Sequence, residues 1–156
     1  MRRMMASTGA ASEAAAPPAP RVLLAEDDQD FRVLLATVLR AAGFEVLEAG
    51  NGAELFDYVA FGLMGGQAKR SFDIIVSDIE MPGYSGLEVL NGIRDACVTI
   101  PVILITAFGD PDKHQAAERL GATLLDKPFD LADLEQAVHT ALSTRPSAGS
   151  QEAQTA

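Results

Sequence analysis

The stretch VLLAEDD, residues 22–28, runs from four apolar residues directly into three acidic ones. Three later apolar runs also end on a polar residue, at Asp78, Thr106 and Lys127. Apolar runs without strict alternation are typical of strands that are covered on both faces, as in a parallel sheet. Ligands of open parallel sheets bind outside the carboxyl ends of the strands, so we expect these four strand ends to form one site.

Amphipathic segments alternate with the apolar runs. The first has Phe31, Leu34, Leu35, Val38 and Ala42 at helical spacing before Gly43 ends the pattern. The second places Leu55, Phe56, Val59 and Leu63 on one helical face. The patterns predict strands at 22–25, 44–47, 72–77, 100–105 and 122–126, and helices at 31–42, 51–64, from 85 onward, at 110–120 and at 130–142.

Five successive strand–helix units predict an α/β fold with a doubly wound, five-stranded parallel sheet. We expect the strand order 2-1-3-4-5, which is the flavodoxin-like three-layer αβα arrangement. This order places the first and third strands side by side. It would therefore bring Asp27, after the first strand, close to Asp78 at the end of the third.

The ends of the chain differ from the middle. Residues 1–20 are rich in Ala, Pro and Ser and are expected to be a disordered leader, and 143–156 a disordered tail, around a single domain at 21–142. No apolar run is long enough to insert into a membrane. The net charge of −10 argues against direct nucleic-acid binding. The single Cys97 excludes an internal disulfide, and we expect a cytoplasmic protein.

Carboxylates from adjacent strand ends would repel one another, by on the order of 4 kcal/mol per pair at ~4 Å in an effective dielectric near 20. A bound cation would relieve that repulsion. Oxygen ligands alone, from Glu26, Asp27 and Asp78, suit a hard ion, so we expect Mg²⁺, with Mn²⁺ as a substitute. Asp78 is the most central carboxylate and is the candidate nucleophile for a phosphoryl group. The Thr106 hydroxyl and the Lys127 ammonium would neutralise the phosphoryl oxygens.

Four short motifs carry a family resemblance. They are Glu26-Asp27, Asp78-x-x-Met81-Pro82-Gly83, Thr106-Ala107 and Lys127-Pro128-Phe129. Together they resemble the receiver domain of bacterial two-component response regulators, over residues 21–142. One departure is Leu124, three residues before Lys127, where the family often has an aromatic residue that moves inward with the threonine.

The resemblance implies that Asp78 becomes a 4-aspartylphosphate, taking phosphate from a histidine kinase or a histidine phosphotransfer protein. Mg²⁺ would be held by Glu26, Asp27, Asp78 and the backbone carbonyl of Glu80. Thr106 and Lys127 would contact the phosphoryl group, and the Lys127–Pro128 peptide would be cis. The side chains of Glu80 and Phe108 would tune hydrolysis of the acyl phosphate.

We therefore expect a phosphorelay switch and not an enzyme, beyond promoting its own phosphorylation and dephosphorylation. The segment 110–120 is the expected moving element, because its apolar face is small: Ala116, Ala117 and Leu120. Its output would be contact with a downstream protein, or onward transfer of the phosphate. Two alternatives remain, namely an aspartyl-phosphate phosphatase suggested by Asp78-x-Glu80, and a receiver-like scaffold that binds partners without phosphorylation.

Overall fold

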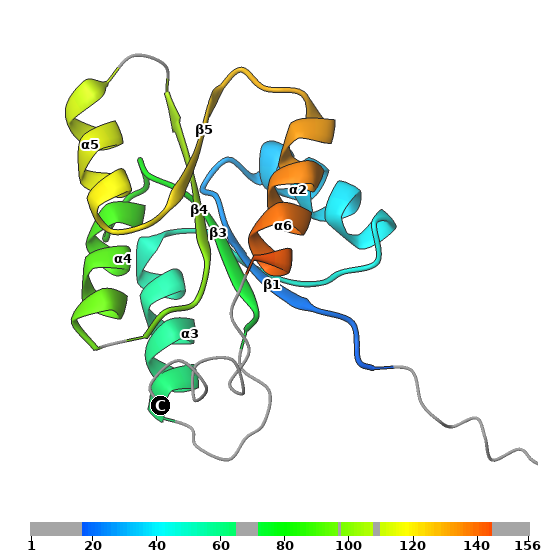
Figure 1. Cartoon of the computed structure of the whole chain (residues 1–156), viewed down its shortest axis with the longest axis horizontal. Coiled ribbons are helices and arrows are strands. Elements are labelled where there is room, and N and C mark those ends of the chain that lie inside the picture. Colours follow the sequence, from blue (N-terminus) through cyan, green and yellow to red (C-terminus); the bar gives the residue numbers. More distant parts are fainter. Residues whose placement is uncertain (1–16, 65–71, 97, 108–109, 145–156) are drawn as a thin grey trace, which may run out of the picture.

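A computed structural model describes residues 17–64, 72–96, 98–107 and 110–144. Strands and helices alternate along the described chain, as Figure 1 shows. The strands are β1 (Arg21–Ala25), β2 (Glu45–Ala49), β3 (Ile74–Asp78), β4 (Val102–Ala107) and β5 (Thr123–Lys127). The helices are α2 (Gln29–Ala41), α3 (Gly52–Met64), α4 (Gly86–Asp95), α5 (Pro111–Arg119) and α6 (Leu131–Ser143).

The strands form one parallel sheet in the order β2-β1-β3-β4-β5, so the predicted fold class and strand order are confirmed. The register aligns the strand ends. Ala25 of β1 lies opposite Ser77 of β3, Asp78 lies opposite Ile105 of β4, and Thr106 lies opposite Asp126 of β5. The polar residues that follow the apolar runs therefore share one edge of the sheet.

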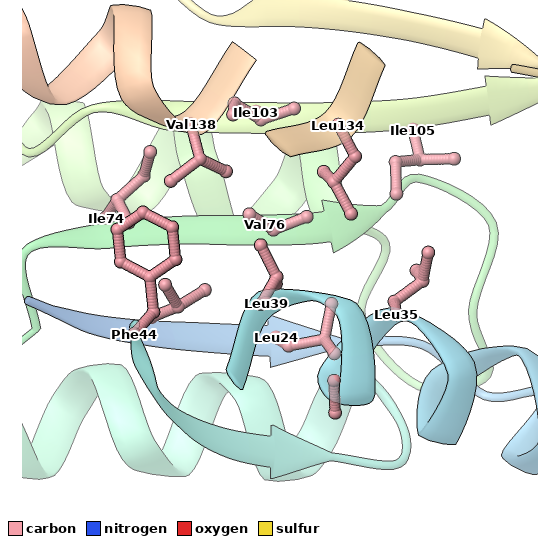
Figure 2. Close-up of a cluster of buried hydrophobic side chains, with 12 residues drawn as sticks. Leu24, Leu35, Leu39, Phe44, Ile74, Val76, Ile103, Ile105, Leu134 and Val138 are labelled. Carbon is pink, nitrogen blue, oxygen red and sulfur yellow. The ribbon is translucent and has the colours of Figure 1, made fainter. Parts of the chain in front are cut away.

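Both faces of the sheet are covered by helices, which explains why the strands are apolar without alternation. On one face, α2 and α6 pack on the sheet through a cluster of buried side chains, which is drawn in Figure 2. On the other face, α3, α4 and α5 pack on a second buried cluster that includes Leu23, Ile75 and Leu104. Within the described residues, no helix combines the length and apolarity needed to cross a bilayer.

Two residues of the predicted apolar helical patterns are not buried. Leu34 of α2 is 45% exposed, and the helix buries Leu35, Ala36 and Leu39 instead. Phe56 of α3 is 44% exposed, while its neighbour Leu55 is buried. Successive helical residues point about 100° apart, and the rotation of each helix on the sheet turns Leu34 and Phe56 toward solvent.

Strand boundaries also differ from the prediction: β2 continues to Ala49 and β3 starts at Ile74. The expected leader at 1–20 lies outside the described residues except for 17–20, where the carbonyl of Pro20 accepts a hydrogen bond from the Glu45 amide at 2.9 Å. The expected tail at 143–156 lies outside the described residues except for Ser143 and Thr144 at the end of α6.

The start of α4 lies unusually close to the end of β3. Ser85 caps the helix together with Glu88 in a capping box. The amide of Gly86 donates to the carbonyl of Ile79 at 3.1 Å. A Cβ atom on Gly86 would lie 2.6 Å from the carbonyl oxygen of Asp78 and 3.0 Å from the Ser77 hydroxyl. Only glycine permits this approach, so α4 is fixed directly against the strand that ends in Asp78.

The same helix offers a matched pair of glycine substitutions. We expect Gly86→Ala to lower the free energy of unfolding by about 2 kcal/mol, because the new methyl group meets backbone atoms that cannot give way. Gly92→Ala places its methyl group where no atom lies within 4 Å, so it should raise stability by up to about 1 kcal/mol through helix propensity. Urea unfolding measures both. Equal effects of the two changes would contradict the close approach at Gly86.

Candidate functional site

Three carboxylates meet at the edge of the sheet where β1 and β3 end. Glu26 and Asp27 follow β1, and Asp78 is the last residue of β3. One oxygen atom from each lies within 4.8 Å of the others. Glu26 and Asp78 are buried, whereas Asp27 is exposed. Among the described residues this is the group of acidic side chains whose geometry could hold a metal ion.

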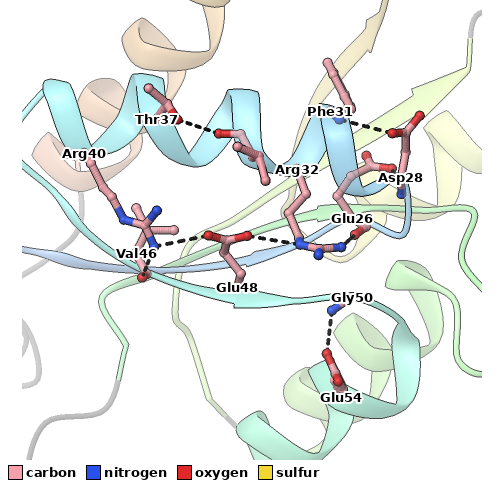
Figure 3. Close-up of polar contacts among 11 residues, drawn as sticks. Glu26, Asp28, Phe31, Arg32, Thr37, Arg40, Val46, Glu48, Gly50 and Glu54 are labelled. Atoms are coloured by element: carbon pink, nitrogen blue, oxygen red, sulfur yellow. Dashed lines mark hydrogen bonds and ion pairs between the residues drawn. The ribbon is translucent and has the colours of Figure 1, made fainter.

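Glu26 is held in place by its backbone. Its amide donates to the carbonyl of Ala49 at 3.1 Å, and its carbonyl accepts from Nη1 of Arg32 at 2.8 Å. Figure 3 shows Arg32 between Glu26 and Glu48, whose Oε1 accepts from Arg32 Nε at 3.1 Å. The Arg32 side chain, from the first half of α2, thereby connects β2 to the residue that follows β1.

The Glu26 carboxylate is only half satisfied. Oε2 accepts a hydrogen bond from the Asp28 amide at 3.1 Å, but Oε1 has no hydrogen-bond partner within the described part of the chain. Burial raises the pKa of Glu26 from its ordinary 4.5 to about 7; the Asp28 amide opposes this rise, and the Asp78 carboxylate adds to it. A buried, unpartnered carboxylate oxygen beside two further carboxylates fits a cation with oxygen ligands.

Asp28 is not part of the acidic cluster and caps the helix that follows it. Its Oδ1 accepts from the Phe31 amide at 3.1 Å, so it is the N-cap of α2 (Figure 3). In the run Glu26-Asp27-Asp28, the first two residues therefore belong to the acidic cluster and the third caps the helix.

Asp78 is 3% exposed and has a donor on each carboxylate oxygen. Oδ1 accepts from the Glu80 amide at 2.8 Å, and Oδ2 accepts from the Lys127 Nζ at 2.9 Å. The buried Ser77 hydroxyl donates to the backbone carbonyl of Asp78 at 2.8 Å. Both the orientation of the carboxylate and the end of its strand are thus fixed.

Lys127 reaches the cluster from β5, two strands away from β3. Its Nζ also lies 4.0 Å from Oε1 of Glu26 and 5.1 Å from the centre of the Phe31 ring. Partial burial lowers the pKa of Lys127, but the hydrogen bond that Lys127 donates to Asp78 and the charges of Asp78, Glu26 and Asp27 outweigh it, so the pKa is raised overall. The ammonium stays charged. The Lys127–Pro128 peptide is cis, as the resemblance implied.

The remaining expected site residues lie around this cluster without joining it. Thr106 is buried at the end of β4, and its hydroxyl donates to the carbonyl of Ala107 at 3.2 Å. The Glu80 side chain is directed to Lys113 of α5, which also contacts Asp110. Phe108 lies outside the described residues.

Sequence reasoning missed Arg32, Phe31 and Lys113. Arg32 and Phe31 lie in the first turn of a helix next to an acidic run, which is a weak signal for contact with the strand end before it. Lys113 gave no signal, since its contact with Glu80 joins segments that are distant in the chain. These contacts depend on how the helices sit on the sheet.

Comparison with known families agrees with this geometry. A family model described as the response regulator receiver domain matches residues 22–139. Among solved structures, the Francisella response regulator 1452 receiver domain has a TM-score of 0.70 at 25% identity, covering 80% of this chain and 97% of that one. The chemotaxis protein CheY4 of Vibrio cholerae has a TM-score of 0.67 at 29% identity, covering 80% and 99%.

Curated relatives are similar over most of this chain. Sporulation initiation phosphotransferase F of Bacillus subtilis is 32% identical over 119 residues, which are 76% of this chain and 90% of that protein. The transcriptional regulatory protein PdtaR of Mycobacterium tuberculosis is 33% identical over 138 residues, which are 87% of this chain but only 63% of that protein. The family match, the sheet order and the relatives agree, and the chain belongs to the response regulator receiver domain family of two-component systems.

Proposed function

We propose that this chain is a phosphoacceptor switch in which Asp78 accepts a phosphoryl group. The observation that carries the proposal is the position of Asp78: it is buried, it is next to two other carboxylates, and it is bonded to the Lys127 ammonium. Response regulator receiver domains act as phosphoacceptors, and Asp78 lies at the strand end where the side chains of Glu26, Asp27 and Lys127 meet. The proposed domain is the segment 21–142.

The proposed donor is a phosphohistidine on a histidine kinase or a histidine phosphotransfer protein. A carboxylate oxygen of Asp78 forms a bond to phosphorus while the bond from phosphorus to the histidine nitrogen breaks. The imidazole leaves with the electron pair of that bond and takes up a proton when released. Lys127 already contacts Asp78 Oδ2, so its ammonium is placed to contact the incoming phosphoryl oxygens.

We propose that Glu26, Asp27 and Asp78 hold Mg²⁺, or Mn²⁺ in its place, together with the backbone carbonyl of Glu80. The unpartnered Oε1 of Glu26 and the all-oxygen ligand set support this assignment. When bound, the cation would neutralise the carboxylates and the negative charge of a transferring phosphoryl group. This chain's own part is to keep the Glu26 and Asp78 carboxylates buried and oriented, by way of Arg32, Ser77 and the Glu80 amide.

The switching element is proposed to be α5. Ala117 is its buried residue, and its N-terminal half is held by polar contacts, from Lys113 to Glu80 and Asp110 and from His114 to Asp126 at 2.7 Å. Phosphorylation would add ~1.5–2 negative charges next to these ties. Leu124 of β5 packs against the core as a partly buried residue, so we propose that Thr106 and α5 transmit the change without an aromatic side chain at that position.

The output is proposed to be contact with a partner protein in the cytoplasm. The relative in Bacillus subtilis is named a phosphotransferase, which supports onward transfer of the phosphate, whereas other relatives are named transcriptional regulators. Mixing the phosphorylated chain with histidine phosphotransfer domains and following the label separates a relay from a direct effector.

The first test is phosphorylation by acetyl phosphate with Mg²⁺. We expect one added phosphoryl mass, located at Asp78 by mass spectrometry. Asp78→Asn should remove it, because an amide oxygen is a poor nucleophile. Asp28→Asn is the matched control: it removes one carboxylate nearby while keeping an N-cap, and it should still be phosphorylated. A folded wild-type protein that takes up no phosphate would instead support the scaffold alternative.

A second test uses the buried charge of Glu26. Its pKa of about 7 in the folded protein exceeds the ordinary 4.5, so its contribution to stability falls as the pH rises from about 4.5 to 7. Without divalent cations, the Glu26→Gln variant should therefore unfold at a higher urea concentration than the wild type at pH 8. Its free energy of unfolding should exceed that of the wild type by about 1–2 kcal/mol at pH 8, and the difference should vanish near pH 4. Adding Mg²⁺ should stabilise the wild type more than the variant.

Asp27→Asn is the control for Glu26→Gln. It removes an exposed carboxylate of the same cluster, so it should lose the response to Mg²⁺ while gaining little stability. If Glu26→Gln were no more stable than the wild type at pH 8, the inference that the buried Glu26 carboxylate destabilises the cation-free protein would be wrong.

A third test measures hydrogen exchange with beryllium trifluoride and Mg²⁺ as an acyl-phosphate mimic. We expect amide exchange in α5 and at Thr106 to change several-fold, because the mimic places negative charge beside the polar ties of α5. Exchange in α2, which packs through three buried side chains, should stay constant. The same experiment on Asp78→Asn should show no change. Unaltered exchange in the wild type would contradict α5 as the moving element.

A further inference from the structure

Two aromatic side chains lie exposed next to each other near the start of α4. Phe56 of α3 and Tyr84, in the loop between β3 and α4, are each 44% exposed. Their rings stack with centroids 4.9 Å apart and an interplanar angle of 29°. On the same helix, Phe61 is 78% exposed. Exposed, adjacent aromatic side chains such as Phe56 and Tyr84 are a frequent mark of a binding surface.

A groove of about 240 Å³ continues from this aromatic pair between α3 and α4. Apart from the exposed Glu88, its walls are apolar or small: Phe56, Val59, Ala60, Val89, Gly92 and Ile93. The space over Gly92 is open, because a Cβ atom there would have no neighbour within 4 Å. A glycine inside a helix costs about 1 kcal/mol relative to alanine, and nothing in the packing of α4 requires it.

The exposed charges of the two helices are mainly acidic. Glu88 lines the groove while its Oε1 accepts from the Ser85 amide at 2.8 Å, and Asp57 and Asp95 are further exposed carboxylates of α3 and α4. Glu54 of α3 accepts from the Gly50 amide at 2.6 Å and is not a wall of the groove. Within the described parts of α3 and α4 the basic residue is Arg94, and its guanidinium donates to the carbonyls of Val98, Ile100 and Leu120. Arg94 is therefore committed to the protein's own backbone, and the groove presents apolar walls with acidic surroundings.

We propose that this groove, defined by Phe56, Val59, Ala60, Val89, Gly92 and Ile93, binds a cationic amphipathic helix of a partner protein. One or two large apolar side chains of that helix enter the groove over Gly92. Its Lys or Arg residues face the acidic side chains of α3 and α4, and the stacked Phe56 and Tyr84 cover one end. Helix-in-groove recognition uses this combination of apolar anchors and flanking charge.

The size of the groove sets the expected strength. A space of this volume accommodates one or two side chains, which is a small interface, so the complex should be transient with a dissociation constant on the order of 10–100 μM. Charge on the partner would mainly raise the association rate and make binding sensitive to salt. The surface lies on α3 and α4, so this inference does not depend on phosphorylation of Asp78.

The test uses a designed peptide as the probe. It is an 18-residue helical peptide with Leu on one face and Lys on the other, and the control peptide has Glu in place of Lys. Titration followed by backbone amide chemical shifts of the full chain should perturb α3 and α4 with the Lys peptide. Affinity should fall at least tenfold from 50 to 300 mM salt. The Glu peptide should bind at least tenfold more weakly.

Two substitutions at one position separate filling of the groove from a change in helix stability. Gly92→Leu occupies the groove and should weaken the Lys peptide at least tenfold, while Gly92→Ala adds a single methyl group and should weaken it less than threefold. Urea unfolding of both variants verifies that they are folded. Equal affinities of Gly92→Leu and the wild type would overturn the proposal.

Other occupants of the groove give distinct results that would also overturn it. A second copy of the chain would give a dimer in sedimentation that Gly92→Leu dissociates. The basic residues Lys69 and Arg70 follow α3 in a segment outside the described residues. If replacing both with Ser strengthened peptide binding several-fold, that segment would be the occupant. Amide chemical-shift changes confined to another face of the protein, or no binding of the Lys peptide, would equally rule out the groove as the binding site.

Discussion

The repulsion between carboxylates at the ends of β1 and β3 is the constraint on which the site depends. Parallel pairing of the two strands brings Glu26 and Asp78 together, and burial removes the water that would otherwise screen them. Within the described protein, the Lys127 ammonium offsets part of that repulsion, and Oε1 of Glu26 stays without a hydrogen bond. The fold therefore holds a charge arrangement that is incomplete by itself and that favours cations and their ligands.

Much of the fold could be predicted from the sequence because the apolar runs, the polar residues at their ends and the helix caps all indicated the same arrangement of strands and helices. Continuous apolar runs indicated strands covered on both faces, and polar residues at their ends indicated the functional edge. The capping box at Ser85 and the N-cap at Asp110 marked helix starts that the structure also has. The sequence pattern could not tell which of the adjacent residues Leu34 and Leu35 is buried. That depends on how the helix is rotated on the sheet, and the structure buries Leu35.

The acidic cluster could be anticipated, but its supporting contacts could not. Strand order alone places Asp27 and Asp78 near each other. The tie from Arg32 to the Glu26 carbonyl, the ring of Phe31 near Lys127 and the pairing of Lys113 with Glu80 each need the three-dimensional positions of helices. The exposed Phe56 is a related case: helical periodicity placed it on one face with Leu55 and Val59, and the structure places it in the wall of a groove.

Arg94 has a mechanical consequence for α5. Its single guanidinium joins the end of α4 to Val98 and Ile100 ahead of β4 and to Leu120, the C-cap of α5. The C-terminal end of α5 is thereby fastened by a charged donor, whereas the N-terminal end is tied by partly exposed side chains near the carboxylates. If phosphorylation displaces α5, the helix would therefore rotate about its attached C-terminal end at Leu120. The movement would be largest at the N-terminal end of the helix and smallest at Leu120.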